Sequence, residues 1–357
     1  MSQFHSLRVA RVSQETREAV VVALEVPERL REEFRFKAGQ HLTLRTYLDG
    51  QEVRRSYSIC SAPFESSLCI AIKRVPGGVF SSWANKELKA GQVIESMKPS
   101  GSFCIEAEPK AKRNHLAFVC GSGITPVISI LKTALKEEPL SRFTLVYGNR
   151  SSSSVIFKEE LEDLKDTYME RLRLVFIMSR EHQDIKLFNG RIDRNKADQL
   201  FKHWIDPTEV DVAYICGPQG MMEGVSASLV ANGVEKNRVR VELFGAGDRV
   251  PRKEVSTAAA VQEECKVTVI QDGRKREVVI ARNEDTILDA IIEQGIELPY
   301  SCKGGVCSTC RCKLTAGEVE MDVHFALEDY EVARGFILPC QSYALTDKIV
   351  LDYDQEG

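Results

Sequence analysis

The chain has 357 residues, of which 43% are hydrophobic and 28% charged, so it has enough apolar material for about two or three globular domains. No stretch approaches the roughly 18 apolar residues of a membrane helix, the first residues lack a signal-peptide pattern, and the formal charge of −4 argues against nucleic-acid binding. Eleven cysteines in such a chain predict reduced thiols in the cytoplasm, where clustered cysteines indicate metal binding rather than disulfides.

The first hundred or so residues have the pattern of short antiparallel strands. Apolar residues alternate at 7–9, 20–24, 42–44 and 68–72, with turn signals between these segments. Many short strands at this spacing predict a small antiparallel β-barrel, which we expect to span residues 1–108.

Two segments of this region have the chemistry of a flavin site. In Arg55-Ser56-Tyr57-Ser58 an arginine can pair with a pyrophosphate, an aromatic ring can pack on a flavin and a hydroxyl can hydrogen-bond its N5 atom. Taken alone, this tetrapeptide also fits an ordinary strand with an exposed arginine. Downstream, Lys73 precedes a glycine-rich stretch that offers close backbone approach, hydroxyls and a helix start suited to phosphate. The residues of that stretch that we expect at the cofactor are Gly78, Val79, Phe80 and Ser81.

Beyond residue 109, apolar strands alternate with helical segments. Strands are expected at 115–120, 143–147, 172–178 and 212–216, and helices at 126–135, 157–164 and about 218–230. This alternation predicts a doubly wound parallel sheet over residues 109–245.

Three strand ends in this region predict a nicotinamide nucleotide site. Gly121-Ser122-Gly123-Ile124-Thr125-Pro126 follows one strand and opens a helix, with Thr125 expected as N-cap and Pro126 as the first helical residue. This is not the G-x-G-x-x-G fingerprint, and a tight strand–helix turn without a ligand is the alternative. Cys216-Gly217-Pro218 ends another strand of the same sheet, so both loops should border one crevice. Ser179-Arg180 follows a third strand, where a basic residue would favour the extra phosphate of NADPH or would be a solvated loop arginine.

The last part of the chain is acidic and separated by a linker. Residues 246–263 are small and polar without an amphipathic period, which is typical of a linker. Residues 264–357 carry 10 Lys+Arg against 18 Asp+Glu, whereas the rest of the chain carries 38 against 34. Asp272-Gly273 predicts a hairpin turn, Thr286 and Asp289 predict a helix start, and Gly295 predicts its end.

The cysteine spacing is the most specific signal in this acidic part. Cys302, Cys307 and Cys310 follow the pattern C-x4-C-x2-C, and Cys340 comes 29 residues later. This is the plant-type spacing for a [2Fe–2S] cluster, in which four thiolates bind two irons. The alternative is a structural zinc site, but zinc usually takes two separated C-x2-C pairs and only Cys307/Cys310 forms one. Cys312 is expected to be a bystander.

These motifs, in this order, resemble the ferredoxin–NADP reductase superfamily with a fused C-terminal plant-type ferredoxin. The resemblance covers nearly the whole chain and is close to the family of reductase subunits of phenylacetyl-CoA 1,2-epoxidase. The stretches that carry it are 4–7, 38–44, 55–60, 121–126, 147–150, 189–193, 216–218 and 298–312. It implies a β-barrel FAD domain, an α/β NAD(P) domain and an α+β ferredoxin domain of the β-grasp type.

The resemblance also implies roles for individual residues. Arg55, Tyr57 and Ser58 would contact FAD, with Ser58 near N5, and Lys73 with residues 78–81 would form the second flavin segment. Thr125 and Cys216 would border the nicotinamide. Glu242-Leu243-Phe244 resembles the Glu-x-aromatic that closes the module beside the flavin ring, or it is simply part of a strand. The catalytic residues would then be Ser58, Cys216 and Glu242. The remaining nucleotide-binding residues would be Gly121, Ser122, Gly123, Arg150, Ser179, Arg180, Gly217 and Pro218.

The expected function is that of a cytoplasmic reductase that takes electrons from NADPH and passes them through FAD and a [2Fe–2S] cluster. By resemblance, the acceptor is the di-iron oxygenase component of phenylacetyl-CoA 1,2-epoxidase, with no nucleic-acid or membrane partner. A reductase of another oxygenase or of a hybrid-cluster protein would share every cofactor motif. A non-enzymatic redox sensor or zinc-stabilised binding module is the alternative of a different class.

Overall fold

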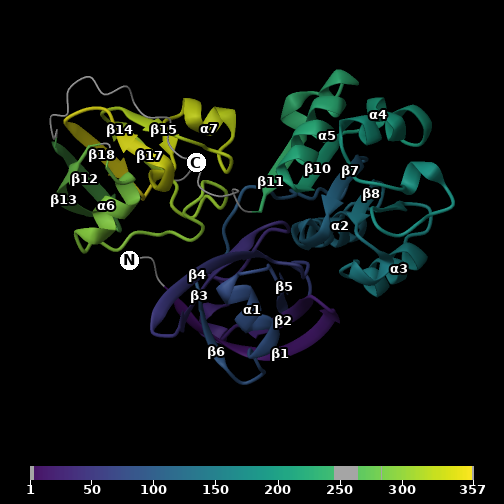
Figure 1. Cartoon of the computed structure of the whole chain (residues 1–357), viewed down its shortest axis with the longest axis horizontal. Coiled ribbons are helices and arrows are strands. Elements are labelled where there is room, and N and C mark those ends of the chain that lie inside the picture. Colours follow the sequence, from purple (N-terminus) through teal and green to yellow (C-terminus); the bar gives the residue numbers. More distant parts are fainter. Residues whose placement is uncertain (1–3, 245–263, 283, 356–357) are drawn as a thin grey trace. The chain divides into compact units, whose positions relative to one another are not determined.

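A computed structural model describes residues 4–244, 264–282 and 284–355 of the chain (Figure 1). The predicted linker, 246–263, lies outside the described residues. The chain divides into two compact units. One contains the parallel sheet and the barrel apart from residues 54–56, and the other is built around the segment beyond residue 264 and includes residues 54–56. No helix in the described parts of the chain is long and apolar enough to cross a bilayer.

The N-terminal region forms the predicted antiparallel barrel. Its six-stranded sheet has the order β4-β3-β6-β1-β2-β5. An antiparallel bridge between Ile59, just after β4, and Ile70 in β5 joins the two edge strands and closes the sheet. The elements are β1 (His5–Thr16), β2 (Ala19–Glu25), β3 (His41–Leu48), β4 (Gln51–Ser58), β5 (Leu68–Lys73), α1 (Val79–Lys86) and β6 (Val93–Ser96).

The alternation that predicted these strands places one side chain in two inside the barrel. Leu7, Val9, Val22, Ile70 and Ile72 are all buried in one hydrophobic cluster. Each such side chain stabilises the fold by about 1.5–3 kcal/mol when it is fully removed from water. The period-2 pattern therefore defines the barrel interior.

The second region forms the predicted parallel sheet, with the strand order β11-β10-β7-β8-β9 and parallel pairing throughout. Its strands are β7 (Asn114–Cys120), β8 (Arg142–Asn149), β9 (Leu172–Met178), β10 (Val212–Gly217) and β11 (Val239–Leu243). Its helices are α2 (Ile124–Glu137), α3 (Lys158–Thr167), α4 (Arg194–His203) and α5 (Gln219–Ala231). The central strand β7 is a run of buried apolar residues, as expected where helices cover both faces of a sheet.

The start of α2 differs from the sequence prediction. The N-cap is Gly123, not Thr125, and Pro126 is the third helical residue instead of the first. The reason is a one-turn 3-10 helix, Gly121–Gly123, that runs directly into α2, so the chain is already helical before Thr125. The Thr125 hydroxyl donates to the carbonyl of Ser122 at 3.0 Å instead of capping the helix. Pro126 is tolerated because the N–H groups of the first helical turn have no partner within the helix.

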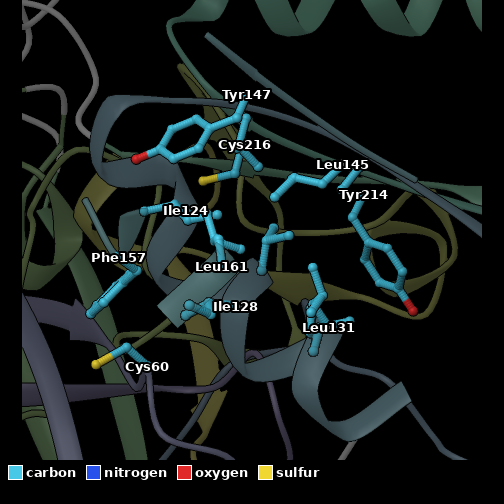
Figure 2. Close-up of a cluster of buried hydrophobic side chains, with 14 of the residues drawn as sticks. Cys60, Ile124, Ile128, Leu131, Leu145, Tyr147, Phe157, Leu161, Tyr214 and Cys216 are labelled. Atoms are coloured by element: carbon cyan, nitrogen blue, oxygen red, sulfur yellow. The ribbon is translucent and has the colours of Figure 1, made fainter. Parts of the chain in front are cut away.

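The core of this unit extends from the parallel sheet into the barrel (Figure 2). One face of β7 and β8 packs on α2, which is buried from Ile124 to Leu135. Cys60, which follows β4 of the barrel, belongs to the same cluster. In addition, the hydroxyl of Ser129 in α2 donates to the carbonyl of Ser61 at 2.6 Å. Helix α2 is therefore the element on which the barrel and the sheet are packed together.

The C-terminal unit is a mixed sheet with short helices, as expected for a β-grasp domain. Its five-stranded sheet has the order β13-β12-β18-β14-β16, and β15 pairs with β17. The strands are β12 (Glu264–Gln271), β13 (Arg274–Ala281), β14 (Cys312–Ala316), β15 (Val319–Met321), β16 (Phe336–Ile337), β17 (Ser342–Ala344) and β18 (Lys348–Asp352), and the helices are α6 (Ile287–Glu293) and α7 (Asp329–Ala333).

The turn and cap signals of this unit are confirmed. Asp272 and Gly273 have φ of 52° and 69°, the left-handed values that a two-residue hairpin turn requires. The Thr286 hydroxyl accepts a hydrogen bond from the N–H of Asp289 and caps α6. Gly295 has φ of 80° just after this helix.

Candidate cofactor sites

The two flavin segments lie side by side on β4 and α1. The ring centroids of Tyr57 and Phe80 are 5.4 Å apart at an interplanar angle of 40°. Ser58 is buried at the end of β4, whereas Arg55 is exposed and Ser56 half-buried. The tetrapeptide thus presents an exposed cation, an aromatic ring and a buried hydroxyl within four residues, as a flavin nucleotide would require.

The start of α1 is shaped to receive an anion. Gly78 is its N-cap, and a Cβ atom there would lie 2.7 Å from the Ser81 hydroxyl and 3.2 Å from the carbonyl of Val75. The same hydroxyl accepts from the N–H of Val75 at 3.1 Å, which fixes the approach to the helix. The N–H groups of the first helical turn, Val79 to Ser81, have no partner within the helix. This glycine-lined helix start fits a phosphate group of the cofactor.

The nucleotide loop packs directly against the end of β10. A Cβ atom on Gly123 would lie 2.1 Å from the carbonyl oxygen of Cys216, so only glycine fits there. A Cβ atom on Gly217 would lie 3.1 Å from that of Cys120. The hydroxyl of Tyr147, on β8, donates to the carbonyl of Gly121 at 2.9 Å and holds the loop from the other side. The two loops therefore meet at the carboxyl ends of adjacent parallel strands, as the sequence predicts.

A group of cations lies at the same end of the sheet. Lys73 extends from β5 to the nucleotide loop, where its Nζ lies 3.3 Å from the position of a Cβ atom on Gly121. Burial, and secondarily the charge of Arg150, lower the pKa of Lys73. The N–H of Arg180 donates to the carbonyl of Arg150 at 2.8 Å, so two exposed arginines follow neighbouring strands. Ser179, beside them, donates its hydroxyl to the Asn149 carbonyl. Lys73 and Arg150 repel each other, and the phosphates of a nucleotide bound between them would relieve this repulsion.

Cys216 and Glu242 are neighbours across two parallel strands. They are directly paired in the β10–β11 register. Burial raises the pKa of Glu242 to about 8, and its Oε2 atom is buried with no hydrogen-bond partner among the described residues. Burial, reinforced by the nearby Glu242, also raises the pKa of the Cys216 thiol. Burial therefore favours the neutral form of both groups. Phe244, one residue beyond β11, is exposed, and Pro218 is the N-cap of α5.

The four predicted cluster cysteines form two pairs. Cys302 interacts with Cys307 and Cys310 with Cys340, and these contacts lower the pKa of Cys302 and Cys340 and raise that of Cys307 and Cys310. Two pairs of thiols fit a cluster that has two irons and four cysteine ligands.

The backbone of the ligand loop is folded toward these sulfurs. Lys303, Gly305 and Ser308 have positive φ angles of 51°, 74° and 49°. Residues with a side chain, here Lys303 and Ser308, adopt such angles only under local constraint. The N–H of Gly304 donates to the Cys302 sulfur at 3.3 Å. Cys312 lies apart from this loop, buried at the start of β14 in the domain core, and burial raises its pKa. It is a core residue and not a member of either thiol pair.

The sequence analysis assigned no role to two residues that support these sites. In the sequence, Tyr147 is one residue of an apolar strand. Only the folded sheet shows that its hydroxyl contacts the nucleotide loop at Gly121. Gln341 follows Cys340 and lies against the ligand loop, where its side chain donates to the carbonyl of Lys303 at 3.0 Å. In the sequence, only its position next to Cys340, a predicted ligand, indicates that Gln341 lies near the cluster site.

Comparisons with known proteins agree with this arrangement. Three family models match the chain: the oxidoreductase FAD-binding domain at residues 6–105, the oxidoreductase NAD-binding domain at 118–227 and the 2Fe-2S iron-sulfur cluster binding domain at 269–345. One subunit of 1,2-phenylacetyl-CoA epoxidase from Escherichia coli is 44% identical over 100% of this chain and 99% of that protein. The ferredoxin reductase component of 3-ketosteroid-9-alpha-monooxygenase from Rhodococcus rhodochrous is 35% identical over 97% and 96% of the two chains.

Among solved structures, phthalate dioxygenase reductase shares the fold, with a TM-score of 0.59, 24% identity and coverage of 98% of each chain. The fold and the matched domains define an NAD(P)H-dependent flavin iron–sulfur oxidoreductase that uses FAD, a [2Fe–2S] cluster and a nicotinamide cosubstrate. The chain belongs to the ferredoxin–NADP reductase superfamily with a C-terminal 2Fe-2S ferredoxin domain, in the same family as the matched subunit of the Escherichia coli epoxidase.

Proposed function

We propose that this protein takes electrons from NADPH and delivers them to the di-iron oxygenase component of a phenylacetyl-CoA 1,2-epoxidase in aerobic phenylacetate degradation. The observation that carries the proposal is the 44% identity to the Escherichia coli epoxidase protein over the full length of both chains. The lower identity to a ketosteroid monooxygenase reductase, also over the full length, supports the general role of an oxygenase reductase. The eleven free thiols support a location in the cytoplasm.

We assign the cofactors to three consecutive domains: FAD to residues 1–108, the nicotinamide nucleotide to 109–245 and the cluster to 264–357, with a linker at 246–263. When bound, FAD accepts a hydride and passes its electrons on singly, as a [2Fe–2S] cluster requires. Such transfer depends on proximity and orientation rather than on acid–base residues. No Ser-His-Asp or paired-carboxylate site is therefore needed.

The chain's own residues would orient these groups. Tyr57 and Ser58 would hold the ring system of FAD, and the start of α1 would hold its phosphates. Thr125 and Cys216 would position the nicotinamide. Because burial keeps Glu242 protonated near neutral pH, this residue would place a hydrogen-bond donor, without a negative charge, beside the nicotinamide.

The preference for NADPH rests on the two arginines that follow β8 and β9. Arg150 and Arg180 are exposed, and a backbone hydrogen bond links their positions. Guanidinium groups at neighbouring strand ends can form charge-assisted bonds to a 2′-phosphate, which NADH lacks. We therefore expect a lower KM for NADPH than for NADH.

The decisive experiment is reconstitution of ring epoxidation. The purified chain, NADPH and the oxygenase component of phenylacetyl-CoA epoxidase should give epoxide from phenylacetyl-CoA, with one NADPH consumed per turnover. A ketosteroid monooxygenase oxygenase component serves as the control acceptor and should receive electrons much more slowly. Equal or faster delivery to the control would contradict the assigned partner. An absorption spectrum without flavin and iron–sulfur bands would favour a redox sensor or zinc module instead.

The order of electron flow has a separate test. A chain that ends at Gln262 should keep FAD, be reduced by NADPH and reduce small artificial acceptors, because the barrel and the parallel sheet form their own compact unit. It should fail to support epoxidation. If the shortened chain drove epoxidation at the full rate, the cluster would lie off the electron path.

A further inference from the structure

A buried amide lies against the sulfur of one proposed cluster ligand. Gln341 directly follows Cys340, and the whole residue is only 7% exposed. Its Nε2 atom lies 3.8 Å from the Cys340 sulfur, within hydrogen-bonding range for a sulfur acceptor. The same nitrogen donates to the carbonyl of Lys303 at 3.0 Å and to that of Cys340 at 2.6 Å. Since the amide has only two N–H groups, the one directed at Cys340 is shared between its carbonyl and its sulfur. The amide N–H groups are therefore directed into the ligand loop.

Several contacts hold this side chain in place. The backbone N–H of Gln341 donates to the carbonyl of Leu338 at 2.8 Å, and its carbonyl accepts from the N–H of Asp322 at 2.9 Å. A Cβ atom on Gly305 would lie 3.0 Å from the Cγ of Gln341, so the side chain packs tightly on the loop. The amide is thus fixed before any electron arrives, and reduction of the cluster requires no reorientation of it.

A donor at this position discriminates between the oxidation states of a cluster. Reduction adds one negative charge, part of which resides on the ligand sulfurs. An N–H dipole directed at a sulfur stabilises the more negative state, and hydrogen bonds of this kind are a main determinant of iron–sulfur potentials. Burial strengthens the effect because little water screens the dipole.

We propose that Gln341 is a positioning residue that raises the reduction potential of the [2Fe–2S] cluster by donating a hydrogen bond to the sulfur of Cys340. The proposal rests on the assignment of Cys340 as a cluster ligand. A higher potential makes the cluster a better acceptor for electrons from FAD. The residue would act on the cluster only through the ligand and the loop.

The test is a redox titration of the full chain, loaded with FAD and the cluster, followed by the electron paramagnetic resonance signal of the reduced cluster. Gln341→Met keeps the length of the side chain and removes the donor, so the midpoint potential should fall. At the wild-type midpoint, the ratio of reduced to oxidised cluster should fall at least threefold. Gln341→Leu, which also lacks a donor, should lower the ratio by a similar factor.

Ser342→Ala is the matched control. Ser342 is the next residue, is fully buried, and donates its hydroxyl to the carbonyl of Leu338 at 2.8 Å, away from the ligand sulfurs. Its removal should leave the midpoint unchanged. An unchanged midpoint in Gln341→Met, with the cluster spectrum intact, would overturn the proposal even if the cluster were lost faster on storage. Loss of the cluster from both Gln341 variants would also overturn it, because the residue would then only hold the loop together.

A different result would contradict the assignment of Cys340 as a cluster ligand. If Cys340→Ser kept the full cluster absorption, Cys340 would not be a ligand and the proposed site would be wrong. That outcome is read from the absorption spectrum of the Cys340 variant, whereas the role of Gln341 is read from a midpoint potential.

Discussion

The proposed ligand loop and the proposed nicotinamide crevice both contain cysteine sulfur, but different groups surround it in each. In the loop, the backbone N–H of Gly304 donates to the sulfur of Cys302 at 3.3 Å. Contacts between thiols lower the pKa of Cys302 and Cys340 and raise that of Cys307 and Cys310. In the crevice, burial and a neighbouring carboxyl group raise the pKa of Cys216. Sulfur that accepts hydrogen bonds is prepared to become a thiolate ligand, whereas sulfur without donors remains a small neutral group.

The two sites also obtain their shape differently. The loop bends by positive φ at Lys303, Gly305 and Ser308, which turns backbone groups toward the sulfurs. At the crevice, the nucleotide loop packs directly against β10 because Gly123 has no side chain where it contacts Cys216. A metal centre thus depends on local loop conformation, whereas the nucleotide site depends on the contact of two strand ends.

The largest expected effect is the loss of the cluster. Cys302→Ser or Cys340→Ser should abolish the iron–sulfur absorption and lower epoxidation to background, because each pair would lose one of its two ligands. FAD should remain bound and reducible by NADPH. Visible absorption and iron content measure both properties on the same sample.

Cys312→Ser is the control for this prediction. This thiol is buried in the same hydrophobic cluster as Cys310 and Cys340 but belongs to neither thiol pair. The variant should keep two irons per chain, with some loss of thermal stability. Loss of iron from this variant, with Cys310→Ser unaffected, would reverse the assignment of the third ligand.

The next effect tests the close approach in the crevice. Gly123→Ala would place a methyl group 2.1 Å from the Cys216 carbonyl, so the nucleotide loop must move away from β10. The KM values for NADPH and NADH should both rise by about tenfold or more, a loss of at least about 1.4 kcal/mol in binding, and Tm should fall. Gly220→Ala in α5 meets no atom within 4 Å and should leave both KM values unchanged. Wild-type kinetics in Gly123→Ala would show that the loop tolerates displacement.

A narrower effect is expected at the edge of the crevice. Arg180→Ala should raise the KM for NADPH by about tenfold, because a charge-assisted bond contributes about 1.5–3 kcal/mol. The KM for NADH should change much less. Arg173→Ala removes an exposed arginine near the start of the same strand, β9, and is the matched control. Parallel changes for both nucleotides would mean that Arg180 does not bind the 2′-phosphate.

The sequence predicts the loop better than the crevice, for a physical reason. Three of the four ligand positions lie within nine residues, so their spacing alone carries the information. The barrel and the parallel sheet follow from apolar periodicity in the same local way. The pairing of Cys216 with Glu242 depends instead on a parallel register between strands separated by a helix, which no local pattern specifies.

Two failures of the sequence reasoning, at Thr125 and at Gln341, have the same origin. Threonine is common at helix N-caps, but the 3-10 turn before Thr125 begins the helix earlier. Gln341 is an ordinary polar residue in the sequence, and only the folded chain directs its amide at the Cys340 sulfur. Local propensity gives the type of element, whereas the partner of a given side chain is set by tertiary contacts.

The smallest expected effect concerns the protonation of Glu242. Burial raises its pKa from 4.5 to about 8, so the folded chain holds a proton that the unfolded chain releases at lower pH. The resulting stabilisation is complete below about pH 4.5 and is lost as the pH rises through about 8. Glu242→Gln cannot titrate and lacks this dependence. Between about pH 6 and pH 9, the Tm of the wild type should therefore fall by a few degrees relative to that of the variant.

Thermal unfolding of the FAD-loaded proteins at several pH values measures this difference, because all other titrating groups are common to both chains and cancel. Glu235→Gln, an exposed carboxyl on the segment before β11, should follow the wild-type curve. Parallel curves for wild type and Glu242→Gln would mean that Glu242 is ionised in the folded protein. The crevice would then carry a negative charge beside Cys216, and this cysteine would no longer lie in neutral surroundings.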